Sequence, residues 1–370
     1  MQITVYEGFA PVALIGSWLT LRYTLSLFGV GEWEGVFLPG DAGVEALARD
    51  RVVLFDNNEA RAFLVERMTW ICLPEGERLV VRGRQLKGLL ARRLVVPPDV
   101  GLVPGDAAQR EYMGWDREEG PADAVMHGYI ERHATQPQDS NRRIPGLVLD
   151  ACTDCGKAVS WWARYQPLDA VLGCIGQAGD MAWDVLYDRT RQEYRVRFAP
   201  LRDCTQDDDG IPAVRFSPRL EGFEQAAMIQ EWMSYHNAYY FGGAGQGCER
   251  LVVLGYTDET GQPGAMVSGW QRYEAFREAR GLDVPADIVA EGYRKVFSRF
   301  QPPMRLEVTP PYPGHVFVYG KEYRLGDVVW VELGDMAVQA PITGMQVTED
   351  GVESVKLFIG GRVTVGGAPA

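Results

Sequence analysis

Residues 80–93 read VVRGRQLKGLLARR, a pattern that predicts a strand running into a short amphipathic helix. Near the other end, residues 323–332 read YRLGDVVWVE, followed by ITGMQVTEDG at 342–351 and VKLFIG at 355–360. This second set predicts two strands, a turn and a third strand. Within it, Gly326-Asp327 indicates a tight bend that starts a strand, because glycine admits positive φ and aspartate can accept hydrogen bonds from nearby backbone N–H groups.

Length and composition predict several folded modules built mainly from short strands. At 370 residues the chain exceeds one ordinary domain, which favours roughly two to four modules. The content of 46% hydrophobic and 24% charged residues is typical of a folded protein. The 42 glycines and 22 prolines interrupt the chain often, so short strands are favoured over long helices.

Charge and apolar patterning exclude some classes of protein. The formal net charge of −13 repels phosphate and disfavours stable nucleic-acid binding. The sequence contains no run of about 18 apolar residues, so we expect no membrane span. The N-terminus lacks a basic start and is interpreted as a first strand and turn, not as a signal peptide. Six scattered cysteines favour a reducing compartment over a disulfide framework.

The first third of the chain has the alternation of β-structure. Residues 19–25 alternate apolar and polar side chains, and residues 32–39 and 51–55 also predict strands. The acidic turn at residues 74–77 closes a predicted hairpin. Short strands with tight turns over residues 1–112 predict a barrel or a sandwich.

The next segment, residues 113–208, changes character. Residues 122–134 and 167–178 have the apolar spacing of helices, whereas residues 180–188 and 192–198 alternate as a β-hairpin. This segment is therefore predicted to be a small α+β module.

Residues 209–303 are predicted to return to strands and then to end in helices. The expected helices are residues 270–280 and 285–300, the second with apolar residues on one face and a stop at Pro302-Pro303. Strands are expected at residues 213–216, 225–234, 238–241 and 250–256. Residues 304–370 return to strands and end in a glycine-rich tail.

Cys152 and Cys155 form a C-x-x-C pair. A structural zinc site needs four ligands, normally with a second pair nearby, and the other four cysteines are isolated in the sequence. A thioredoxin-like site would place the pair between a strand and a helix, and a strand ending at Leu149 with a helix starting near Lys157 leaves that alternative open. We interpret the pair as a loop with two free thiols.

Three other patterns each lack part of the motif they approach. His127, Glu131 and His133 do not form H-E-x-x-H and are interpreted as polar groups on an exposed helix face. The glycine-rich residues 242–247 are followed by a strand-like segment, not by the helix that a phosphate cradle needs, and predict a hairpin loop. Asp207-Asp208-Asp209-Gly210 lacks the ligand spacing of an EF-hand and predicts an exposed acidic turn. We assign no catalytic, cofactor-binding or metal-binding residue.

A series of short motifs resembles, in order and spacing, the baseplate hub or tail-associated protein family of long-tailed bacteriophages. The motifs run through most of the chain: the strand with Trp18, Arg22 and Tyr23, then residues 32–38, 82–93, 195–198, 214–217, 243–245, Arg250, 325–329 and 358–360.

This resemblance implies a homotrimer with two related β-barrels per subunit and a lateral α+β module. Six barrels would form a pseudo-sixfold ring that joins a sixfold tail tube to a threefold tip. The implied domains are a first barrel at 1–112, the lateral module at 113–208, a linking region of strands and helices at 209–303, and strands completing the second barrel at 304–370. Cyclic trimers use head-to-tail interfaces that close on rotation.

The resemblance also implies a structural virion protein of the tail tip, assembled in the host cytoplasm, with no enzymatic activity and no cofactor. Its expected partners are the distal tail or tail tube protein, the C-terminus of the tape-measure protein, and tip or fibre proteins. DNA would pass through a neutral to acidic lumen without stable binding. Basic residues are then expected at subunit or tube contacts, namely Arg82, Arg84, Lys87, Arg92 and Arg93.

Two other classes remain alternatives. A tail-tip peptidoglycan hydrolase would use two facing carboxylates, and with 50 acidic residues the sequence cannot select or exclude such a pair. A carbohydrate-binding module would present an aromatic platform on an exposed face. No hydrolase domain or fibrous extension follows the Gly-rich end at Ala370, so lytic activity of the virion is expected on another protein.

Overall fold

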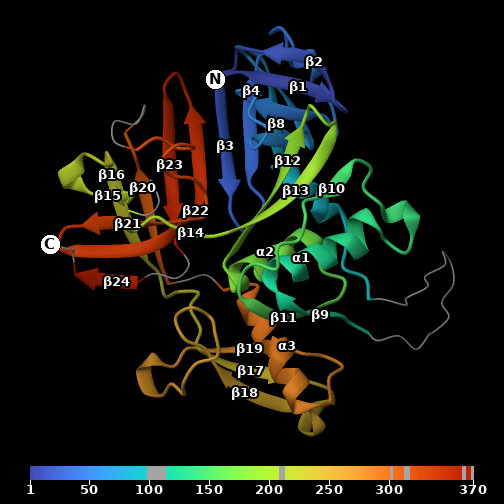
Figure 1. Cartoon of the computed structure of the whole chain (residues 1–370), viewed down its shortest axis with the longest axis vertical. Coiled ribbons are helices and arrows are strands. Elements are labelled where there is room, and N and C mark those ends of the chain that lie inside the picture. The colour runs from blue at the N-terminus through green and yellow to red at the C-terminus, as the bar shows by residue number, and fades with distance from the viewer. Residues whose placement is uncertain (98–113, 208–212, 301–302, 312–316, 361–363, 368–370) are drawn as a thin grey trace.

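The computed structural model describes residues 1–97, 114–207, 213–300, 303–311, 317–360 and 364–367. The chain is mainly β, as predicted (Figure 1). Strands from both ends of the chain form the upper part of the molecule in Figure 1, an α+β module lies beside them, and a small sheet with one helix lies below.

The largest sheet joins strands from the two ends of the chain. Its N-terminal strands are β3 (Thr20–Ser26), β4 (Glu32–Phe37), β7 (Arg67–Leu73) and β8 (Gly76–Arg84). Its C-terminal strands are β16 (Gln225–Gln230), β20 (Met304–Thr309), β22 (Met336–Glu349) and β23 (Glu353–Ile359). The strand order is β16-β20-β23-β22-β3-β4-β8-β7, with every neighbouring pair antiparallel. The two ends of the chain therefore meet where β3 lies against β22 (Figure 1).

The long strand β22 belongs to two layers. Its second half pairs with β23 and β3, and its first half pairs with β21 (Asp327–Leu333) and β24 (Thr364–Gly367). A register shift between Ile342 and Gly344 marks the change. The short strands β14 (Arg202–Asp203) and β15 (Arg215–Phe216) extend the second layer beside β21. The two strands, turn and third strand predicted for residues 323–360 are confirmed.

A second sheet at the N-terminus has the order β2-β1-β5-β6 and covers the core. Its strands are β1 (Ile3–Glu7), β2 (Ala10–Ile15), β5 (Val52–Phe55) and β6 (Ala62–Leu64). The predicted alternation of β3 is confirmed, because Leu21, Tyr23 and Leu25 are buried. Tyr23 stacks on Phe55 with 4.8 Å between ring centroids. One continuous buried cluster links these residues to Leu306 and the C-terminal strands.

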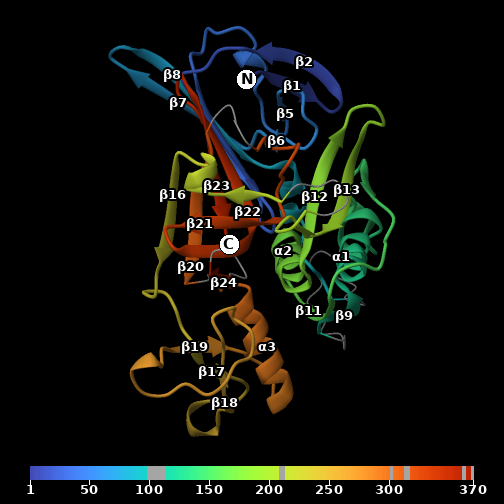
Figure 2. The same cartoon turned by 60° about the vertical axis from the view of Figure 1, so that its left-hand side comes forward.

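The α+β module packs two helices against a hairpin. Its elements are β9 (Asp116–Pro121), α1 (Ala122–Ile130), β10 (Leu147–Leu149), β11 (Ala158–Ala163), α2 (Leu168–Gly179), β12 (Met181–Asp188) and β13 (Glu193–Pro200). The predicted helices at 122–134 and 167–178 and the hairpin at 180–198 are confirmed, with a π-helical turn at Glu131–Thr135 extending α1. Figure 2 shows α1 and α2 beside β12 and β13.

The small lower unit contains β17 (Ala238–Gly242), β18 (Val252–Tyr256), β19 (Glu274–Glu278) and α3 (Pro285–Phe297). The predicted helix at 285–300 is confirmed as α3. The predicted helix at 270–280 is wrong, because β19 pairs in parallel with β17 and completes a sheet of order β18-β17-β19. Pairing with β17 here outweighs the helical spacing of the local sequence. Trp270, which precedes β19, is fully exposed.

Short helical turns connect the strands. The 3₁₀ turns are Val44–Ala46, Leu86–Arg92, Ser140–Arg142, Pro218–Leu220, Gly247–Glu249 and Gly269–Gln271. The helix predicted after residue 85 is thus confirmed as a 3₁₀ helix. Across the described parts of the chain, no helix is both long and apolar enough to cross a bilayer.

Candidate functional site

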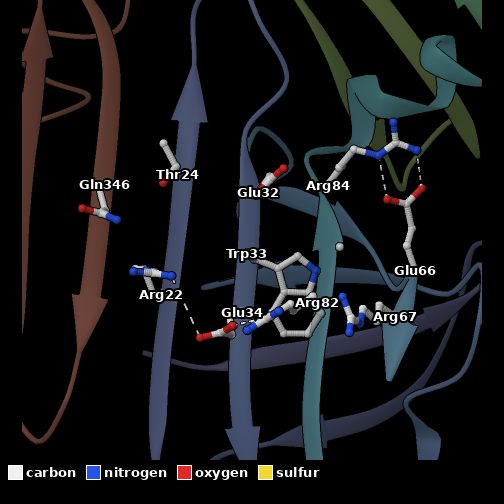
Figure 3. A pocket seen from close by; sticks show the side chains of 11 residues that line it. Arg22, Thr24, Glu32, Trp33, Glu34, Glu66, Arg67, Arg82, Arg84 and Gln346 are labelled. Atoms are coloured by element: carbon white, nitrogen blue, oxygen red, sulfur yellow. Dashed lines mark hydrogen bonds and ion pairs between the residues drawn. The ribbon is translucent and has the colours of Figure 1, made fainter. Parts of the chain in front are cut away.

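A charged groove lies on strands β3, β4 and β8 (Figure 3). Its volume is 710 Å³. Side chains of alternating charge line it, because residues of one face of each strand project into it: Arg22, Glu32, Glu34, Glu66, Arg67, Arg82 and Arg84.

Ion pairs hold most of the carboxylates in this groove. Arg84 contacts the Glu66 carboxylate through Nε at 2.7 Å and Nη2 at 2.8 Å, a bidentate arrangement. Arg92 adds a third contact to Glu66 at 3.2 Å. Glu34 pairs with Arg82, and Arg22 lies 4.0 Å from it.

These contacts decide the protonation of Glu66. The hydrogen bond from Arg84 lowers the pKa of the Glu66 carboxyl below its usual range, so this group stays ionised at neutral pH. A glycosidase acid needs the opposite shift, because it must donate a proton to the leaving group. The groove can contact a charged partner surface, but Glu66 is poorly suited to general acid catalysis.

A second cavity of 280 Å³ lies where the end of β3 and the Gly326-Asp327 bend meet β12 and β13. Burial raises the pKa of the Asp184 carboxyl, as an acid catalyst would require. Asp184 Oδ1 nevertheless accepts hydrogen bonds from Gln85 Nε2 at 3.2 Å and from the Val185 amide at 2.8 Å. These contacts give Asp184 a structural role at the junction of the modules.

Asp327, in the same cavity, is also committed to structural contacts. Its buried carboxylate accepts from Arg202 Nε at 2.8 Å and from the Arg324 amide at 2.8 Å. The predicted bend is confirmed: Gly326 has φ +91° and β21 begins at Asp327. The ion pair between Asp327 and Arg202 was not predicted, because nothing in the sequence pattern links residues 125 positions apart.

The structure corrects the expected role of Lys87. This residue was expected at a subunit or tube contact, but its side chain is 0% exposed. Its Nζ donates to the backbone oxygens of Ser26 at 2.6 Å and Leu27 at 3.1 Å, and lies 4.6 Å from the centre of the Trp183 ring. Burial lowers the pKa of Lys87 to about 8. Lys87 therefore fastens β3 to the α+β module within one chain.

The structure also corrects the position of His133. His127 and Glu131 are half-buried, whereas His133 is 3% exposed and not on an open helix face. The π-helical turn directs its ring inward, where Nε2 lies 2.6 Å from Asp116 Oδ2. Burial lowers the pKa of His133, which favours the neutral ring.

Cys152 and Cys155 lie in the loop between β10 and β11. Both are free thiols, in line with the interpretation of the C-x-x-C pair as a loop. Possible ligand atoms of Cys152, Asp123 and Asp154 lie within 4.8 Å of one another, one short of the four that a closed zinc site needs. Asp123 Oδ2 already accepts from the amide and hydroxyl of Thr153 at 3.0 and 2.9 Å. Partial burial raises the pKa of the Cys152 thiol, which disfavours a reactive thiolate.

The glycine-rich residues 242–247 lie between antiparallel strands β17 and β18, so the predicted hairpin loop is confirmed. Of the acidic turn, Asp207 is exposed and accepts a hydrogen bond from the Ala213 amide at 2.7 Å. Residues 208–210 of that predicted turn lie outside the described residues.

Strand β7 carries an exposed apolar surface that was not predicted from the sequence. Trp70, Ile71 and Leu73 are exposed by 60%, 36% and 36% on a strand at the end of the largest sheet. The sequence signal for this surface was a run of residues favourable for a strand that contains one charged residue, Arg67. A strand at the edge of a sheet usually carries more charged residues than that.

Comparisons with known proteins identify a family and a shared fold. The chain matches the family described as Siphovirus ReqiPepy6 Gp37-like protein over residues 7–360. It matches no curated protein. Among solved structures, it resembles the 43 kDa tail protein of prophage MuSo2 from Shewanella oneidensis with a TM-score of 0.53 and 10% identity, covering 97% of this chain and 98% of that one. A tail protein from Neisseria meningitidis MC58 gives a TM-score of 0.50 and 11% identity, over 96% of this chain and 95% of that one.

At such low identity the two structures show a shared fold, while the family match spans nearly the whole sequence. The resemblance to phage tail proteins drawn from the sequence motifs is thereby confirmed. The chain belongs to the Siphovirus ReqiPepy6 Gp37-like protein family.

Proposed function

We propose that the protein is the hub of a phage tail tip or baseplate. Three copies form a ring that adapts the sixfold tail tube to a threefold tip and encloses part of the DNA channel. Two related β-barrels per subunit supply six similar units around that ring, and the α+β module lies outside it.

The observation that carries this proposal is a repeated strand order in the largest sheet. The N-terminal strands β3, β4, β7 and β8 are the first to fourth strands of their unit in chain order. In the sheet they lie in the order β3-β4-β8-β7, that is, first, second, fourth and third. The C-terminal strands β16, β20, β22 and β23 lie in the same order, again with antiparallel neighbours. Two units of one topology in each chain support a ring in which three subunits present six similar faces.

The proposed domains are those expected from the sequence: 1–112, 113–208, 209–303 and 304–370. Strand β16 lies in the third segment and joins the strands of the fourth, so the second unit draws on both. The small sheet with α3 is inserted between β16 and β20.

The proposed channel is neutral to acidic, which lets DNA pass without being held. Each copy has a formal net charge of −13, so three copies together carry −39. The proposed neighbours are the distal tail or tail tube protein, the tape-measure C-terminus, and tip or fibre proteins. The charged groove of Figure 3 is a candidate contact surface for one of them, because it combines both signs of charge on a rigid sheet.

A purely structural role is proposed over the hydrolase alternative. Glu66 is held ionised by Arg84, and Asp184 and Asp327 are engaged in structural contacts. A cell-wall clearing assay on purified peptidoglycan should show no turnover. Clearing that is lost in Asp184→Asn would establish the hydrolase instead.

Light scattering of the chain alone and mixed with the distal tail protein tests the proposed assembly. The proposal expects three copies of this chain in the complex. A complex with one copy or with six copies would contradict it.

A further inference from the structure

The charged groove of Figure 3 contains a row of side chains that lie directly opposite one another on four adjacent strands. Arg22 on β3 is paired in register with Glu34 on β4. Glu34 is paired with Arg82 on β8, and Arg82 is paired with Arg67 on β7. Residues directly opposite in a ladder share one face of the sheet, as Figure 3 shows for these four. This set, called the arginine row, therefore holds three guanidinium groups and one carboxylate.

The single carboxylate of the arginine row is shared by two of its arginines. Glu34 forms an ion pair with Arg82, and Arg22 Nη2 lies 4.0 Å from Glu34 Oε1. Arg67 is exposed, and within the described residues its side chain has no ion pair or hydrogen bond. Like charges directly opposite each other on neighbouring strands destabilise a sheet. Arg67 beside Arg82 therefore leaves a site where a further negative charge would be stabilising.

The neighbouring carboxylates of the groove do not supply that charge. Glu66 is held by Arg84 at 2.7 and 2.8 Å and by Arg92 at 3.2 Å. Glu32 lies directly opposite Arg84 in the β4–β8 ladder, outside the arginine row. The lining as a whole has four arginines and three glutamates, on a chain whose net charge is −13. The groove is thus locally basic on an acidic protein, and the excess lies in the arginine row.

We propose that the arginine row binds an extended peptide segment of a neighbouring tail protein through two carboxylates of that segment. One carboxylate lies between Arg67 and Arg82, and the second contacts Arg22 at the other end of the row. Three strand spacings separate Arg22 from Arg67, roughly 14 Å. An extended peptide covers that distance in about four residues, and side chains four positions apart point to the same face. The proposal rests on the proposed hub for the presence of neighbouring proteins, but not for the chemistry of the groove.

A peptide fits this groove better than a nucleic acid does. A nucleic-acid strand carries a negative charge at every phosphate, and the carboxylates of Glu32 and Glu34 would repel such continuous charge. A peptide can place carboxylates over the arginines and a neutral side chain over Glu34. Ile71 and Leu73 share the face of Arg67 on β7 and are both exposed, so an apolar residue of the same peptide has a surface to contact.

Binding of a synthetic peptide to the full chain tests this assignment. The probe is fluorescein-labelled Thr-Glu-Val-Thr-Val-Glu-Thr, whose glutamates are four positions apart, and its control peptide has glutamine at both positions. In fluorescence anisotropy at low ionic strength only the glutamate peptide should bind, and added salt should weaken binding because exposed charges are screened. Arg67→Gln and Arg22→Gln should each weaken binding roughly fivefold with unchanged thermal melting, since each removes a charge-assisted contact at an exposed site.

Two further variants separate the arginine row from the overall charge of the chain. Arg280→Gln is the matched control, because it removes an arginine whose side chain is 82% exposed in the small lower unit, and it should bind like wild type. Glu34→Gln should tighten binding, because it frees Arg22 and Arg82 from their shared carboxylate. Equal weakening in Arg280→Gln, or a Glu34→Gln variant that binds no more tightly than wild type, would overturn the proposal.

The remaining outcomes distinguish this site from the proposed hub. An oligothymidine of the same length that binds the arginine row more tightly than the peptide would assign the groove to nucleic acid and overturn the proposal. No peptide binding by a chain that still forms three-copy assemblies would overturn the peptide site and leave the hub intact. Peptide binding that depends on the arginine row, in a chain present as one copy per tail tip, would overturn the hub and leave the peptide site standing.

Discussion

Replacement of Gly326 by valine should destabilise the junction between the C-terminal layers and the α+β module. Gly326 has φ +91°, which costs a residue with a Cβ about 1–2 kcal/mol. A Cβ at this position would lie 3.3 Å from Leu27 Cδ1 and 3.4 Å from Leu201 Cδ2, and the two further methyl groups of valine add crowding worth about 1 kcal/mol. The expected loss in the free energy of unfolding is therefore about 2–3 kcal/mol, with a corresponding defect in assembly.

Gly334→Val separates the two contributions. Gly334 has φ +61°, and no atom lies within 4 Å of the position that a Cβ would occupy there, so that variant should lose only the backbone part, about 1–2 kcal/mol. Chemical denaturation measures the total loss, and faster amide exchange in β21 and β22 should locate it. Equal losses in the two variants would refute the crowding, and wild-type stability of Gly326→Val would refute the strained bend itself.

Three further predictions concern buried or paired side chains. Asp327→Ala should lower the free energy of unfolding by about 3 kcal/mol, because it leaves the partly buried Arg202 guanidinium without its carboxylate; a loss under about 1 kcal/mol in chemical denaturation would contradict this. Replacing Cys152 and Cys155 together by serine should leave melting and assembly nearly unchanged, whereas one bound zinc per chain together with unfolding of the double variant would show a metal site. Burial holds the pKa of His133 below its ordinary value of about 6.5, so the unfolded chain takes up a proton before the folded chain does. The free energy of unfolding should therefore fall as the pH drops below about 6.5. The His133→Gln variant should show a weaker pH dependence of thermal melting between about pH 7 and pH 5, and an unaltered pH dependence would contradict this prediction.

Much of the local structure was predictable because periodicity reports which face of an element is buried. The alternation around Tyr23 and the helical spacing in α3 each identify a buried face. The strand β19 was missed, since a short amphipathic segment fits either period until its neighbour is known, and β17 is that neighbour.

The long-range contacts were beyond the sequence for a different reason. Periodicity does not say which strand pairs with which, so neither the β3–β22 junction nor the repeated strand order could be read in advance. Lys87 and His133 were misplaced on the surface because charged or titratable residues are usually exposed. Each is buried beside oxygen acceptors supplied by distant segments, the carbonyl of Ser26 and the carboxylate of Asp116.

The copy number and symmetry of this chain in the tail tip test the central claim most directly. A density map of isolated tails, reconstructed without imposed symmetry, gives both. The account predicts three copies around the tail axis, with N-terminal and C-terminal sheet units alternating as six similar segments of one ring. A single copy, or six copies each contributing one unit to the ring, would contradict it.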